Sequence, residues 1–170
     1  APVEFMRICW PWFVDVFGEI VSSDNDASGY IYPSRYVVEL DFDQEVEKRY
    51  TRERPLLEAA RIAIENFAQT DPDGYMRWVD EYSPIEQMPV QQLIARGFEI
   101  AGKSLATPAL SWLLADQRRF QLGGLRGHRV STLSLIRNIA THLSESDVRK
   151  FESAVRAYRP SIPAHLTEPS

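Results

Sequence analysis

The sequence is poor in the features that define secreted, membrane-spanning and zinc-binding proteins. It has one cysteine in 170 residues, so Cys9 has no partner within the chain for a disulfide, and no cysteine cluster is available for zinc. The most apolar stretch, Ile8 to Val14, contains Pro11 and is far shorter than the ~20 apolar residues of a spanning helix. The opening residues also lack the basic and apolar regions of a secretory leader. We therefore expect a cytoplasmic protein that does not cross a membrane.

Excess positive charge is also missing, and the charges that are present are unevenly distributed. The 19 lysines and arginines are outnumbered by 24 aspartates and glutamates, for a net charge of −5. Residues 1–50 carry −6 and residues 51–100 carry −4, whereas residues 101–150 carry +5. Net attraction to nucleic acid or to anionic lipid is therefore not expected, and the electrostatic character changes sign along the sequence.

The remaining composition, with 44% hydrophobic and 25% charged residues, is that of a folded domain. At the start of the chain, apolar side chains recur every three or four positions, which predicts an aromatic helix over about 3–21 that Pro11 must bend. The small polar residues 22–29 predict a loop. Residues 30–50 fit either a short strand or a short helix. We expect an irregular crossing there, with a helical turn near 43–50, because two strands without a further partner would be marginal.

After Pro55 the apolar periodicity is close to that of an α-helix, and each helix start is marked by a capping residue or by a proline in the first turn. Six helices are predicted there, and their starts are marked by Pro55, Asp71-Pro72, Pro89, Thr107-Pro108, Ser131 and Ser144. Alternate starts lie 34 to 42 residues apart, which is the spacing of paired-helix repeats.

The predicted fold is therefore all-α, a paired-helix repeat of the α-solenoid type. Residues 1–54 would form the aromatic helix and an irregular acidic segment, residues 55–159 three helix-hairpin repeats, and residues 160–170 a Pro-rich tail. The alternative is a compact helical bundle, because helices of average length joined by short loops give similar spacings.

Motifs for catalysis, nucleotides or metals do not stand out. Gly102-Lys103-Ser104 ends a predicted helix instead of following a strand, so it does not support a phosphate-binding loop. The histidines, at positions 128, 142 and 165, lack the spacing that places two imidazoles on one helical face. Cys9 lies on the apolar face of the first helix, where packing is the simpler role. We predict no catalytic residue, no cofactor and no metal.

One cluster of basic side chains is singled out by the sequence. It comprises Arg118, Arg119, Arg126, His128, Arg129 and Arg137, with no acidic residue between Asp116 and Glu145. Such a cluster attracts carboxylates or phosphates, and the planar arginine fork pairs well with carboxylates. It would dock on the acidic half of the same chain or on a protein partner. Nucleic acid is less favoured because the whole chain is acidic.

Several stretches resemble the HEAT- or TPR-like helical-repeat regions of bacterial signal-transduction NTPases of the STAND/NACHT type. They are residues 111–123 (Ser-Trp-Leu-Leu-Ala-Asp-Gln-Arg-Arg-Phe-Gln-Leu-Gly), residues 132–140 and residues 143–155. The resemblance implies a sensor or scaffold segment whose NTPase and effector portions lie outside this chain. It implies recognition of a partner and no turnover of a substrate.

The functional hypothesis is a non-catalytic protein-interaction or scaffold module. Its predicted partner-binding residues are Arg118, Arg119, Arg126, His128 and Arg129. The first alternative is a nucleic-acid-binding helical array. The second is a small enzyme that uses an acid–base pair such as Asp116 with His128.

Overall fold

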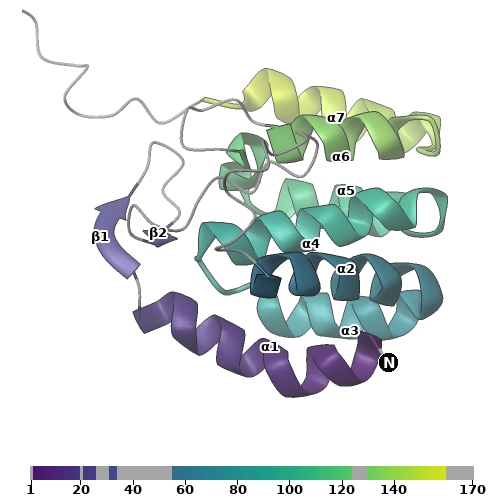
Figure 1. Ribbon diagram of the computed structural model, residues 1–170. Helices are drawn as coiled ribbons and strands as arrows, with labels where there is room; N and C mark the ends of the chain where they lie inside the picture. The colour runs from purple at the N-terminus through teal and green to yellow at the C-terminus, as the bar shows by residue number, and fades with distance from the viewer. Residues whose placement is uncertain (1, 20, 26–30, 34–54, 124–129, 160–170) are drawn as a thin grey trace, which may run out of the picture.

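The computed structural model describes residues 2–19, 21–25, 31–33, 55–123 and 130–159 (Figure 1). Within these ranges the chain is almost entirely helical, which confirms the predicted all-α class. The elements are α1 (Pro2–Glu19), β1 (Val21–Asn25), β2 (Ile31–Pro33), α2 (Pro55–Thr70), α3 (Pro72–Tyr82), α4 (Met88–Ala101), the 3₁₀ helix η1 (Gly102–Leu105), α5 (Ala106–Ala115), the 3₁₀ helix η2 (Gln117–Gln121), α6 (Val130–Ala140) and α7 (Glu145–Ala157).

The predicted helix starts agree with the structure because they depend on local chemistry. The Asp71 side chain caps α3 by accepting a hydrogen bond from the Gly74 N–H at 2.9 Å. The Ser144 hydroxyl caps α7 in the same way, accepting from the Asp147 N–H at 3.2 Å. Such caps satisfy N–H groups that have no partner inside the helix. α1 runs through Pro11 as one helix, as its apolar period predicts.

Two sequence expectations are wrong at the first strands. Residues 22–25, expected in a loop, belong to β1, and residues 31–33, expected in an irregular crossing, form β2. The two strands pair antiparallel, with Val21 opposite Pro33 and Asn25 opposite Ile31. Backbone hydrogen bonds do not require apolar side chains, so the polar composition of residues 22–25 concealed the strand. The helical turn expected near 43–50 falls outside the described residues.

The helices are stacked from α1 at one end to α6 and α7 at the other (Figure 1). α2 packs against α1 and α4, and α4 packs against α6, so these four helices follow one another in one layer. α3 packs against α2 and α4, while α5 contacts α4, α6 and α7. No helix within the described ranges has both the length and the apolar character needed to cross a bilayer.

An aromatic core runs through four of the helices. Trp10 of α1 meets Trp78 of α3 edge-on at 5.0 Å between ring centroids. Tyr75 of α3 stacks on Trp78 and meets Phe98 of α4 edge-on at 5.4 Å. Phe98 in turn lies 5.5 Å from Trp112 of α5. Aromatic pairs in these arrangements add stability beyond their burial. The first helix therefore shares one core with the helices that follow Pro55.

A row of charged side chains also joins α2, α4 and α6. On α2, Arg61 pairs with Glu65 at 2.6 Å. Arg96 of α4 links this Glu65 at 2.7 Å to Glu99 at 3.0 Å on its own helix. Glu99 accepts a further hydrogen bond, at 2.7 Å, from the Ser134 hydroxyl of α6. Because the row connects three neighbouring helices and its arginines are largely covered, it holds their relative positions more firmly than isolated surface pairs would.

Candidate functional site

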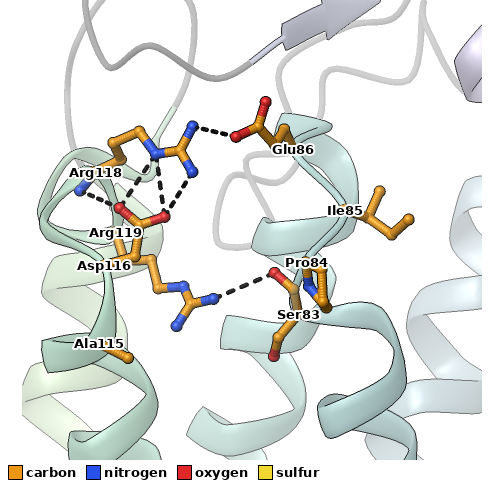
Figure 2. A pocket seen from close by; sticks show the side chains of 8 residues that line it. All are labelled: Ser83, Pro84, Ile85, Glu86, Ala115, Asp116, Arg118 and Arg119. Atoms are coloured by element: carbon orange, nitrogen blue, oxygen red, sulfur yellow. Dashed lines mark hydrogen bonds and ion pairs between the residues drawn. The ribbon is translucent and has the colours of Figure 1, made fainter.

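A polar cleft of about 320 Å³ lies where the connection between α3 and α4 faces the end of α5 (Figure 2). The two walls come from segments that are about thirty residues apart in the sequence. One wall is formed by Ser83, Pro84, Ile85 and Glu86, and the other by Ala115, Asp116, Arg118 and Arg119. The cleft therefore contains two of the five residues that the sequence predicts to bind a partner.

Arg119 forms the floor of the cleft and is buried, with 6% of its surface exposed. Its guanidinium donates to the carbonyl oxygen of Trp112, to that of Ser83 at 3.3 Å, and to the side-chain oxygen of Gln91 at 3.2 Å. The same group lies over the Trp112 ring, with its central carbon 4.4 Å from the ring centroid. Carbonyl oxygens and an aromatic face together compensate a buried cation. Arg119 thus joins α5 and η2 to the end of α3.

Gln91 of α4 completes this arrangement from the other side. Its side-chain nitrogen donates to the carbonyl oxygens of Ser83, at 3.0 Å, and Ile85, at 2.7 Å. The side chain is fully buried and holds the α3–α4 connection on one side and Arg119 on the other. A connection held at two of its carbonyls by a buried side chain has less freedom to change shape. The wall carrying Glu86 is therefore fixed relative to the wall carrying Arg118.

Arg118 lies at the mouth of the cleft and bridges its two walls (Figure 2). It pairs with Asp116 at 2.9 Å on its own wall and with Glu86 at 2.9 Å on the other. The Asp116 carboxylate also accepts from the Arg118 backbone N–H at 2.9 Å and caps η2. The side chains of Arg118 and Glu86 are 36% and 54% exposed, so this pair is open to water.

The predicted basic cluster therefore divides into residues with different roles. Arg119 is inside the protein, which corrects the expectation that its guanidinium meets a partner directly. Arg118 is on the surface but is paired with two carboxylates of its own chain. Arg126, His128 and Arg129 lie outside the described residues. The sequence pattern could not tell that Arg119 is buried and Arg118 is at the surface, because it did not show that both lie in a 3₁₀ helix, where adjacent side chains point in different directions.

Glu86, which lines the cleft, and Gln91, which supports one wall from inside the protein, were not singled out by the sequence. Glu86 lies in a short connection without a recognisable motif, and only the fold brings it opposite Arg118. Gln91 and the neighbouring Gln92 stand in a helix whose other residues are mainly apolar, and both are buried. Polar residues enclosed by apolar ones on every side of a helix are a sequence signal of buried hydrogen bonding.

Residues 97–104 match the spacing of a phosphate-binding loop, Gly-x-x-x-x-Gly-Lys-Ser, but the structure gives them another role. Gly97 lies inside α4, whose backbone N–H groups are used within the helix. Gly102, with φ of +51°, ends that helix by donating to the Phe98 carbonyl oxygen. The Ser104 hydroxyl donates to the carbonyl oxygen of Ala101 at 3.0 Å. A phosphate-binding loop needs free N–H groups between a strand and a helix, and the chain here is helical instead.

The chemistry available in the cleft is that of charge recognition. Among the described residues, Arg118 meets the carboxylates of Glu86 and Asp116 at the mouth, while Arg119 on the floor is bound to carbonyl oxygens. No three His, Cys, Asp or Glu side chains come together as metal ligands anywhere in the described ranges. Of the hypothetical acid–base pair, Asp116 lies in the cleft and is bound to Arg118, and His128 lies outside the described residues.

Comparison of the chain with family models, with curated proteins and with solved structures found no match. The function is therefore inferred from the residues themselves.

Proposed function

We propose that the chain is a non-catalytic helical scaffold that binds a protein partner. In this proposal α2–α3, α4–α5 and α6–α7 are three degenerate repeats of an α-solenoid-like array. The consecutive packing of α2, α4 and α6 and the paired-helix spacing of their starts support it. Such arrays present long, fixed surfaces and need no cofactor to do so.

The resemblance to sensor segments of STAND/NACHT-type NTPases is consistent with this role and stays part of the proposal. A segment of that kind would recognise a partner in the cytoplasm, while another part of the protein would hydrolyse the nucleotide. The helical setting of Gly97 and Gly102 agrees with a division of labour in which this part of the chain does not cradle phosphate.

The observation that carries the proposal is the bridge of Arg118 across the cleft. Arg118 is exposed and is held between Glu86 and Asp116, on walls that the buried Arg119 keeps in place. A partner carboxylate can take Arg118 from Glu86, and a partner lysine or arginine can pair with the Glu86 that is released. This exchange suits a protein surface with both signs of charge. Among the described residues, a phosphate at the mouth would meet the carboxylates of Glu86 and Asp116 beside Arg118, while Arg119 on the floor is already bound to carbonyl oxygens, which disfavours nucleic acid.

The test compares affinity capture by the natural chain and by single charge reversals, with bound proteins quantified by mass spectrometry. We expect Arg118→Glu to lose a defined set of proteins at least about tenfold, because a like charge then faces Glu86 and the partner's acidic group. Arg77→Glu is the matched control, since Arg77 is an exposed arginine on α3 outside the cleft. Charge reversal of Arg119 is unsuitable, because a carboxylate would be buried there.

Two results would count against the proposal. One is that Arg118→Glu captures the same proteins as the natural chain and as Arg77→Glu, so that no captured protein depends on Arg118. The other is binding of labelled duplex DNA with a steep salt dependence, which would favour the nucleic-acid alternative. Circular dichroism and thermal melting of each variant show whether a lost interaction reflects lost folding.

A further inference from the structure

The stack of helices has two end surfaces, and within the described residues both expose apolar side chains. α1 forms one end and α6 with α7 the other (Figure 1). Between them each helix of the layer covers the next, α1 on α2, α2 on α4 and α4 on α6. The end helices of such a stack normally turn a polar face to water. Exposed apolar residues there indicate that something covers these ends.

At the first end, α1 presents an apolar ridge on its outer side. Met6 and Trp10 are buried in the shared core. Ile8 lies two residues after Met6, and Trp12 lies two residues after Trp10. At about 100° per residue, this places Ile8 and Trp12 on the opposite side of the helix. They are 61% and 52% exposed. The ridge therefore points away from α2.

At the other end, a narrow apolar groove of about 80 Å³ opens between the last helices. All its lining residues are apolar and come from α5, α6, α7 and the turn between the last two, namely Leu110, Leu113, Ile136, Ile139, Ala140, Leu143, Val148 and Phe151. Leu133 on α6 and Val155 on α7 are further exposed apolar residues of these two helices, at 55% and 45%. Leu133 lies opposite the buried Leu135 on α6, so it faces away from the core.

The two ends also differ in charge. α1 carries three acidic side chains and one basic, and its exposed Asp15 follows Trp12 by one helical turn. The only charged side chain of α6 is Arg137, which is exposed one turn after Leu133. α7 is balanced in charge and is followed by the exposed Arg159. Opposite signs beside the two apolar surfaces favour contact between the first end of one molecule and the last end of another.

We propose that a second copy of this chain is the partner of these ends, and that copies stack head to tail. The ridge of Ile8 and Trp12 on α1 of one copy lies in the groove between α6 and α7 of the next, as an additional layer of the same stack. The two surfaces are different, so each copy keeps one free end after pairing, and the assembly grows with concentration instead of closing as a symmetric dimer. The contact uses no residue of the polar cleft and does not depend on the proposed partner binding there.

The test measures the mass of the 170-residue chain by sedimentation and light scattering over a wide concentration range. Ile8→Glu blocks the first end, and Val148→Glu, in the lining of the groove, blocks the last. Both side chains are exposed, at 61% and 36%, and neither belongs to the buried core. Ile62→Glu is the matched control, because Ile62 is 46% exposed on α2, inside the stack. A carboxylate pressed into an apolar contact should weaken association about a hundredfold.

The expected pattern is specific to head-to-tail stacking. The natural chain and Ile62→Glu form a series of growing oligomers, whereas Ile8→Glu and Val148→Glu are each monomeric. An equimolar mixture of these two variants forms a dimer and nothing larger, because one intact ridge meets one intact groove. A monomeric natural chain at every concentration would overturn the proposal. So would a mixture that stays monomeric, or association that only one of the two blocking variants abolishes.

Discussion

Replacement of Arg119 by leucine removes the buried cation that joins α5 and η2 to the end of α3. Leucine occupies part of the same volume but donates no hydrogen bonds, so the Trp112 carbonyl oxygen and the Gln91 side-chain oxygen lose the donor that Arg119 provides. The Ser83 carbonyl oxygen keeps its bond from Gln91. The favourable position of the guanidinium over the Trp112 ring is lost as well.

The size of the effect follows from these contacts. A hydrogen bond from a charged donor contributes about 1.5–3 kcal/mol, and an acceptor left buried without a donor costs a further amount of about 1–3 kcal/mol. A cation over an aromatic ring adds about 0.5–2 kcal/mol. These terms are not additive, and leucine regains part of the loss by apolar burial, so we expect Arg119→Leu to lower the free energy of unfolding by about 3–5 kcal/mol. Domains are stable by about 5–15 kcal/mol, so the variant should remain folded but be close to the limit.

The adjacent Arg118 is the control for this prediction. Its ion pair with Glu86 is exposed and the one with Asp116 is half-buried at the surface, so Arg118→Leu should lower the free energy of unfolding by no more than about 1 kcal/mol. The free energy of unfolding of both variants is measured by urea denaturation, with the helix content followed by far-ultraviolet circular dichroism. Equal free energies for the two variants would refute the distinction between a buried and a surface arginine.

Two further predictions concern the core and the last helix. Gly97→Ala should destabilise the protein by about 1–3 kcal/mol despite the higher helix propensity of alanine, because the added Cβ would lie 2.5 Å from the Tyr75 hydroxyl oxygen; a higher thermal midpoint would contradict this. Hydrogen bonds from Lys150 and Ser144 hold the pKa of Asp147 below its ordinary 3.8. The carboxylate therefore contributes stability that is complete above pH 3.8 and is lost as the pH falls through the folded-state pKa. Asp147→Asn should be less stable than the natural chain at pH 7, and urea titrations at decreasing pH should show the difference shrinking below pH 3.8; a difference independent of pH would refute the role of the charge.

The helices could be predicted from sequence because their signals are local. Asp71 and Ser144 cap the helices that follow them through hydrogen bonds within four residues, and these bonds form whatever lies further away. The strand β1 could not be predicted in this way, because all its residues after Val21 are polar and its partner β2 is a separate segment. Strand formation depends on the partner as much as on the residues themselves.

The sequence by itself determined that the chain after Pro55 is helical, where most of its helices begin, and that positive charge is concentrated after residue 100. Only the tertiary structure decided what each charge does. Arg118 and Arg119 are chemically identical neighbours, yet one lies in water between two carboxylates and the other is enclosed by carbonyl oxygens and an indole ring. Glu86, Ser83 and Trp112, which make this difference, are between seven and thirty-six residues away along the chain. Their approach depends on how α3, α4 and α5 pack, and no pattern within a single helix contains that information.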